Sequence, residues 1–229
     1  MIHDKRQFGI GAMLMAVFAG GLVLIFSPIF ENGRNALDHM DGVFNSISKA
    51  SAYYIPGSME KARKLEGTTV SVKIKANGPE EASRMEKLFC AAGATVHVDG
   101  TKLAVSGDLG RILATALADA DAMFRNDGPA VSAKYGFEGR RALHVWHVAL
   151  SEVTKDLNRQ EKFRESSTVR DAITKGLEPA YNYYGVTAIS MKKMMGVALV
   201  ALIGYVVYTV WYGYAILFLF EGWGLKLEH

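Results

Sequence analysis

Two long apolar segments without a charged residue lie near opposite ends of the chain. The first covers residues 8–30 and the second covers residues 194–220, and neither contains Asp, Glu, Lys, Arg or His. An α-helix needs roughly 20 apolar residues to cross the hydrocarbon core of a bilayer. The sequence therefore predicts a membrane protein with two transmembrane helices and a polar domain between them.

The first segment reads as a retained anchor rather than a cleaved signal peptide. The hydrophobic region of a signal peptide spans only about 7–15 residues and is followed by a small-x-small cleavage site. Here the apolar segment ends in Ser27-Pro28-Ile29-Phe30-Glu31, which has no such pattern. At the other end of the chain, Leu227-Glu228-His229 is typical of the start of a histidine tag, and we expect residues 227–229 to lie outside the native fold.

The basic residues near the two spans bear on topology. Lys5 and Arg6 favour a cytoplasmic N-terminus, whereas Lys192 and Lys193 before the second span favour a cytoplasmic domain. The first helix usually dominates, and long domains cross the membrane regardless of charge. We therefore expect a multi-pass protein of the bacterial inner membrane with a periplasmic domain.

Residues 67–137 alternate between strand and helix patterns. Helix patterns begin at Pro79 and after Asp108, and Asp99-Gly100 predicts a hairpin turn. The strand patterns cover residues 68–75, 95–98, 102–106 and 130–135. This order, βαββαβ, is that of a ferredoxin-like domain, in which two helices cover one face of a four-stranded sheet.

Long helices are predicted on both sides of this domain, in residues 31–66 and 138–193. Each carries a seam of apolar or small side chains at alternating spacings of three and four, which is typical of a helix that packs lengthwise on another helix. The first seam is Leu37, Met40, Phe44, Ile47, Ser51 and Tyr54, and the second is Leu143, Trp146, Leu150, Val153 and Leu157. We expect a membrane-proximal stalk, whose helices pair within one chain or with copies of themselves. The predicted fold class is thus an α+β membrane protein with two transmembrane helices, stalk helices and a ferredoxin-like domain.

The spans carry two further patterns. Small residues recur every four positions in the first span, at Ala12, Ala16 and Gly20, and small residues at this spacing allow helices to approach closely. In the second span, hydroxyl-bearing rings occur at Tyr205, Tyr208 and Tyr212. We expect the first stripe, like the seam at residues 143–157, to form an oligomer interface. We expect the tyrosines to pack on a protein neighbour, with a pore lining as the alternative.

Few side chains suggest chemistry. His144 and His147 lie one helical turn apart and could hold a metal or a haem, but neither a carboxylate nor a cysteine lies beside them in the sequence. We expect two partly exposed histidines. Cys90 is the single cysteine, which excludes an internal disulfide, and its apolar neighbours predict a buried or half-buried thiol.

Two pairs of aspartates have spacings at which an acid/base pair is conceivable. Asp119 and Asp121 are predicted to point to different faces of their helix, and Asp38 and Asp41 to lie on a solvated face. Neither pair therefore predicts catalysis.

The sequence contains no catalytic motif such as a P-loop or H-E-x-x-H, and its net charge of +3 comes without a Lys/Arg block. We expect no cofactor, no metal and no nucleic-acid partner. The leading hypothesis is a non-enzymatic membrane protein that self-associates and acts as an envelope scaffold or assembly factor, with lipid, its own copies and other envelope proteins as partners. The alternatives are an oligomeric channel lined by the second span, and an accessory subunit of a membrane enzyme or electron-transfer complex that uses His144 and His147.

The order of elements, with an α+β domain and a long helix between two spans, resembles in outline the polysaccharide co-polymerases of bacterial inner membranes, which form rings. The resemblance is one of architecture only. Those proteins carry a Pro-rich segment beside the second span, whereas this chain has only Pro179 there.

Overall fold

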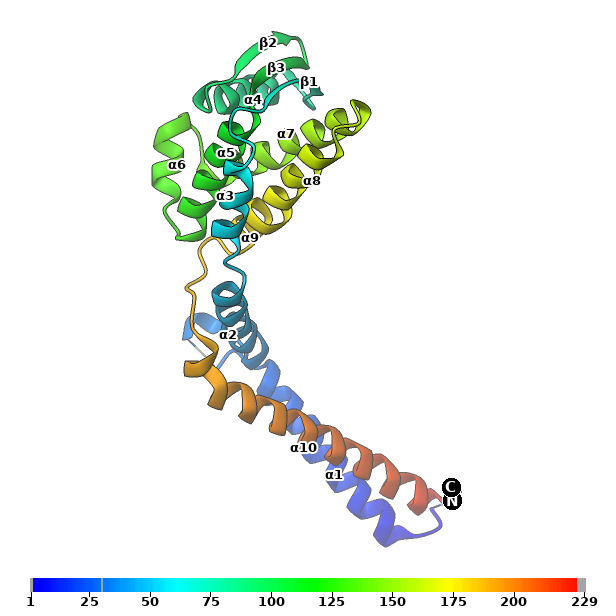
Figure 1. Ribbon diagram of the computed structural model, residues 1–229. Helices are drawn as coiled ribbons and strands as arrows, with labels where there is room; N and C mark the ends of the chain where they lie inside the picture. The colour runs from blue at the N-terminus through cyan, green and yellow to red at the C-terminus, as the bar shows by residue number, and fades with distance from the viewer. Residues whose placement is uncertain (1, 30, 226–229) are drawn as a thin grey trace. The chain divides into compact units, whose positions relative to one another are not determined.

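A computed structural model describes residues 2–29 and 31–225 (Figure 1). The predicted tag residues 227–229 lie outside the described residues. The protein is mostly helical, with one small antiparallel sheet. It divides into two compact units, Met1–Ile47 with Ala188–His229, and Ser48–Thr187.

The first unit contains the two predicted spans and the start of a third helix, α2, which runs on into the second unit. Its elements are α1 (Lys5–Phe26), η1 (Glu31–Gly33), α2 (Ala36–Ser51) and α10 (Met191–Trp223). Both α1 and α10 are long and apolar enough to cross a membrane, in agreement with the two predicted transmembrane helices. Asp4 caps the start of α1 by accepting hydrogen bonds from the backbone N–H groups of Arg6 and Gln7.

The two apolar helices pair in antiparallel fashion, and glycines allow their backbones to approach. A Cβ atom at Gly11 would lie 2.6 Å from the backbone nitrogen of Leu219, and one at Gly222 would collide with the backbone of Phe8. Only glycine fits at either position. The pairing brings the start of α1 beside the end of α10, where the backbone nitrogen of Asp4 donates to the carbonyl of Gly222 (3.0 Å).

The second unit combines a helical core with a three-stranded sheet. Its elements are α3 (Ile55–Arg63), β1 (Thr69–Lys75), α4 (Pro79–Ala91), β2 (Thr95–Asp99), β3 (Lys102–Asp108), α5 (Leu109–Phe124), α6 (Gly128–Tyr135), α7 (Gly139–Arg159), α8 (Phe163–Ala172), η2 (Ile173–Leu177) and α9 (Glu178–Asn182). The strand order is β1-β3-β2, with every pair antiparallel. The predicted hairpin is confirmed, with Gly100 and Thr101 between the paired residues Asp99 and Lys102, and Gly100 adopts a positive φ of 60°.

The predicted fourth strand is wrong, because residues 130–135 belong to helix α6. Asp127 caps this helix by accepting from the backbone N–H of Ala130 (3.3 Å), Pro129 lies in its first turn, and Gly136 ends it in a left-handed conformation. These start and stop signals outweigh the alternation of apolar and polar residues. A ferredoxin-like fold is therefore not confirmed.

Helix α7 covers one edge of the sheet. This is the free edge of β1, the strand whose other edge pairs with β3. The Asp156 carboxylate accepts a hydrogen bond from the backbone N–H of Lys73 (3.0 Å), and the Gln160 amide donates to the carbonyl of Ser71 (2.9 Å). Both backbone groups belong to β1. Side chains of α7 and of its C-cap residue thus form hydrogen bonds with backbone groups of β1 that could otherwise pair with another strand.

The predicted stalk helix α7 is instead a core helix of the second unit. Leu143, Trp146, Leu150, Val153 and Leu157 are each at most 2% exposed. Since α7 packs on β1 and on its neighbours α4, α5, α6 and α8, the seam faces the interior of its own chain. Of the two pairings that the spacing allows, α7 shows the pairing within one chain.

A buried lysine ties the two ends of the second unit together. Lys49 is 2% exposed, and its Nζ donates to Asn126 Oδ1 (3.0 Å) and to the carbonyls of Tyr183 (3.0 Å) and Val186 (2.7 Å). Burial lowers the pKa of this lysine. The three oxygen acceptors use all three protons of the ammonium group, which is what makes its burial tolerable.

Candidate functional site

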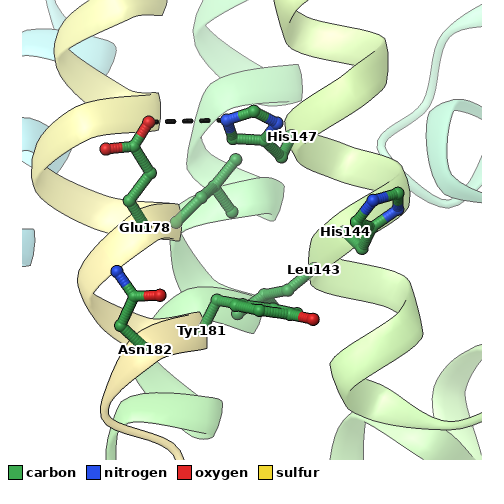
Figure 2. A pocket seen from close by; sticks show the side chains of 7 residues that line it. Leu143, His144, His147, Glu178, Tyr181 and Asn182 are labelled. Carbon is green, nitrogen blue, oxygen red and sulfur yellow. Dashed lines mark ion pairs between the residues drawn. The ribbon is translucent and has the colours of Figure 1, made fainter.

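A small recess lies between α7 and the segment formed by η2 and α9, in the second unit (Figure 2). Its volume is about 260 Å³. Leucines line its apolar part, and two histidines, a carboxylate, an amide and an aromatic ring line the rest. The residues are Leu143, His144, His147, Leu177, Glu178, Tyr181 and Asn182.

One side of the recess is formed next to an irregular helical turn, residues 173–177, which contributes Leu177 to its lining. Residues 173–177 form a π-helix, a conformation that occurs mostly as single turns and often at functional sites. A Cβ atom at Gly176 would collide with the side chain of Leu117, so glycine lets this turn pack against α5. Pro179 then starts α9, which directs Glu178 and Tyr181 toward α7.

The polar groups of the recess face one another across it. Figure 2 shows that His147 Nε2 points toward Glu178 Oε1, at a distance of 3.4 Å. Both side chains are about half exposed, at 44% and 45%. The guanidinium carbon of Arg140 lies 4.6 Å from the centre of the Tyr181 ring, a cation–π contact that covers one face of the ring. The recess can therefore hold a small polar group or a basic side chain against Glu178.

The two histidines do not act as a pair. His147 is directed at Glu178, whereas His144 lies one turn along α7 and farther from that carboxylate (Figure 2). Among residues 2–29 and 31–225, no group of three or more His, Cys, Asp or Glu side chains could hold a metal ion. The carboxylate partner of His147 comes from a distant part of the chain, so sequence proximity could not reveal it.

The prediction for Cys90 is wrong, because the thiol is exposed. Met85, Leu88 and Phe89 form the buried face of α4, and Cys90 follows one residue later. One residue along an α-helix is a rotation of about 100°, which turns Cys90 away from the core. Apolar neighbours in sequence were therefore a poor guide to its burial.

The expectation that Asp119 and Asp121 point apart is confirmed. Asp119 is 4% exposed and accepts from Trp146 Nε1 (2.9 Å), Lys134 Nζ (2.7 Å) and the Tyr135 hydroxyl. Burial and the hydrogen bond to Asp119 raise the pKa of Tyr135. Sequence reasoning missed this buried network, although an aspartate on the apolar face of α5 was a usable signal.

Asp121 lies on the outer part of α5. It accepts a hydrogen bond from the Tyr53 hydroxyl (2.7 Å) and pairs with Arg125 (2.7 Å). On α2, Asp38 and Asp41 are both exposed, as expected for a solvated face.

The tyrosines of the second span differ in their surroundings. Tyr208 stacks on Phe18 of α1 with ring centres 4.3 Å apart, and Tyr212 lies 4.8 Å from the same ring. Tyr205 is 68% exposed. Two of the three predicted residues thus contact the other span of the same chain.

The small residues predicted for an oligomer interface lie on the free side of α1. Ala12, Ala16 and Gly20 are exposed, and a Cβ atom at Gly20 would meet nothing within 4 Å. Gly11 faces α10 instead. The structure therefore separates the five predicted residues of α7, which are buried in the second unit, from the three of α1, which are uncovered.

The chain matches no protein-family model, no curated protein and no solved structure.

Proposed function

We propose that this protein is a non-enzymatic integral membrane protein that self-associates and organises an envelope assembly. In this proposal α1 and α10 anchor each copy and make the contacts between copies within the membrane. The second unit, residues 48–187, is the body to which other envelope proteins bind.

The observation that carries the proposal is the uncovered small-residue stripe of α1. Ala12, Ala16 and Gly20 lie one turn apart on the side of α1 that α10 does not cover. In a membrane, helices associate largely through close packing at small residues, since lipid is as apolar as their larger side chains. A stripe that the partner span leaves open is suited to a helix of a neighbouring copy.

The test is the mass of the full chain in a mild detergent, measured by light scattering. We expect a defined homo-oligomer. Ala16→Leu fills the stripe and should shift the particle toward smaller species, whereas Val17→Phe adds comparable bulk away from the stripe and should leave the mass unchanged. A wild-type particle with the mass of a single chain would refute the proposal.

We further propose that the protein lies in the bacterial inner membrane with the second unit in the periplasm. Lys5 and Arg6 precede the first span and support a cytoplasmic N-terminus. The antiparallel pairing of α1 with α10 implies that both chain ends share that side.

Cys90 provides the test of topology, because it is the only cysteine and is exposed. A membrane-impermeant maleimide should label Cys90 in intact spheroplasts. An Ile2→Cys, Cys90→Ser variant should be labelled only after lysis. The reverse pattern would place the second unit in the cytoplasm.

A further inference from the structure

The apolar seam of α2 is exposed at the surface of the first unit. In the part of this helix that belongs to the first unit, the seam comprises Leu37, Met40, Phe44 and Ile47, at spacings of three, four and three. Leu37 is 50% exposed and Phe44 is 48% exposed, while Met40 and Ile47 are half-buried. Among the described residues of the first unit, no other helix packs lengthwise on α2.

One contact of the chain with α2 lies to the side of this seam. The carbonyl of Ser46 accepts a hydrogen bond from the backbone N–H of Ile189 (3.1 Å), and Ser46 is nearly buried. On a helix, Ser46 is turned well away from Phe44. The segment that returns toward α10 therefore leaves Leu37 and Phe44 exposed.

An uncovered helix of this composition needs a partner to remain folded. Helices of roughly this length are marginal in water even when rich in alanine, and α2 contains a glycine and several serines. Asn35 and Asp38 cap its start with reciprocal backbone hydrogen bonds (2.9 and 3.4 Å), but caps alone do not stabilise a helix of this kind. Lys49 anchors the last turn of α2 through its three hydrogen bonds, so contacts along the seam are the available source of stability for the turns before it.

The pattern favours a helix rather than lipid as the partner. A seam that repeats every 3.5 residues on average is the signature of helices wound along each other. A helix lying on a membrane surface usually has basic residues on its polar face, whereas the exposed acidic residues Asp38 and Asp41 stand beside this seam. The charge on the polar face is thus opposite to the one that anionic lipids attract.

We infer that the α2 seam binds the α2 seam of a second copy of this chain, forming a short coiled coil next to the membrane. This inference rests on the proposed self-association and locates its contact outside the membrane. A second copy is the partner that accounts for both uncovered surfaces, because a symmetric contact brings the same two elements together from each copy. Those surfaces are the α2 seam and the Ala12, Ala16 and Gly20 stripe of α1.

Disulfide and maleimide cross-linking in membranes tests the inference by its periodicity. In a Cys90→Ser background, single cysteines replace Leu37, Met40 or Phe44 on the seam, and Asp38, His39 or Asn45 as controls on the polar side of the helix. We expect dimeric cross-links several-fold stronger at the seam than at the controls. Adding Phe44→Glu to the Met40→Cys variant should abolish most of its cross-linking.

The outcomes separate this inference from the proposed function. If the full chain is oligomeric by mass but cross-links without periodicity, the α2 contact is wrong and self-association stands. If the mass is that of one chain, both are wrong. If a fluorophore on the Met40→Cys variant is quenched by brominated lipids and no cross-link forms, the seam binds the membrane surface, which also overturns the inference.

Discussion

Helices α2 and α7 carry the same sequence pattern and have opposite surroundings. Both have apolar side chains at alternating spacings of three and four, yet every seam residue of α7 is at most 2% exposed, while Leu37 and Phe44 of α2 are about half exposed. Helix α7 has a sheet edge and several helices of its own chain around it. Helix α2 follows the short η1 turn after the first span, and among the described residues of its own unit no helix lies along its seam. The spacing thus specifies that a helix packs lengthwise, but not which chain supplies the partner.

The largest effect is expected from a charge in the α7 seam, which tests whether this seam is part of the core of the second unit. Leu150→Glu buries a carboxylate without a partner, which should destabilise the second unit by about 3–5 kcal/mol or prevent its folding. Thermal unfolding of the full chain in non-ionic detergent, followed by near-UV circular dichroism, measures the loss. The exposed Arg141→Glu change on the same helix serves as control and should have little effect. A Leu150→Glu protein that unfolds like the wild type would mean that the seam is not a core.

Helix α7 is also held by a buried carboxylate, that of Asp119 on α5. Asp119→Ala removes the carboxylate that Trp146, Lys134 and Tyr135 share, and should cost about 3 kcal/mol because buried donors lose their acceptor. Asp121→Ala, which removes a more exposed carboxylate, should cost less than about 1 kcal/mol. Denaturant unfolding of the two variants would show whether this difference exists. Equal losses would contradict the assignment of Asp119 as the anchor.

Ion pairs within the second unit add a smaller, pH-dependent contribution. Burial raises the pKa of Asp171, but hydrogen bonds from Lys175, Lys61 and Ser58 outweigh it and lower the pKa to about 2. The lowered pKa stabilises the folded state fully above the unfolded value of about 4, and this stabilisation is lost as the pH falls toward 2.

Because the two lysines are half exposed, the effect should be only about 1 kcal/mol. The difference in unfolding free energy between wild type and Asp171→Asn, measured from pH 6 to pH 2.5, should therefore shrink toward the acid end. A difference that does not change with pH would argue against the ion pairs.

Hydrogen bonds from α7 to the sheet edge should contribute about as much. Asp156→Ala leaves the backbone N–H of Lys73 without its acceptor, at a cost of about 1 kcal/mol. Amide exchange at Lys73 should accelerate, while Lys155→Ala, which removes an exposed side chain that pairs with Glu152 instead, should leave it unchanged. If exchange at Lys73 is unaltered in the Asp156 variant, the hydrogen bond to Asp156 is not what protects this backbone N–H of β1.

The smallest effect on the stability of the second unit is expected from the α2 seam. Phe44→Ala should change its unfolding free energy by less than about 0.5 kcal/mol, since Phe44 lies outside its core. The same substitution should reduce the oligomer mass if copies meet along α2. A large loss of stability in the second unit would mean that α2 belongs to its core after all.

Much of the local structure could be predicted from the sequence. The two apolar segments, the first three strands and the hairpin at Gly100 correspond to observed elements, because each rests on a local pattern of hydrophobicity or backbone conformation. The fourth strand failed for a local reason too, since Asp127, Pro129 and Gly136 are helix start and stop signals that outweigh six alternating residues. In this segment the helix-capping residues are therefore a stronger signal than the alternation of apolar and polar residues.

The candidate site was less predictable. The sequence shows His147 as one member of an i,i+3 pair with His144. Its carboxylate partner Glu178 lies on another helix, after a π-helical turn that no sequence pattern predicts. The buried network around Asp119 and the role of Lys49 likewise depend on groups far apart in the chain. Hydrogen bonds between distant segments follow from packing and leave only a faint signal in sequence, such as a charged residue on an apolar helix face.

The sequence by itself determined which segments are apolar enough to enter a bilayer and where most helices and strands begin. It also determined which faces of α2 and α7 are apolar. Those properties depend on residues within a few positions of each other. Only the tertiary structure decided that α7 is covered by its own chain, that α10 takes the Gly11 side of α1, and that Leu37 and Phe44 of α2 and the stripe of α1 are exposed. The physical reason is that burial is shared between two surfaces, and the partner of each surface is set by the path of the whole chain.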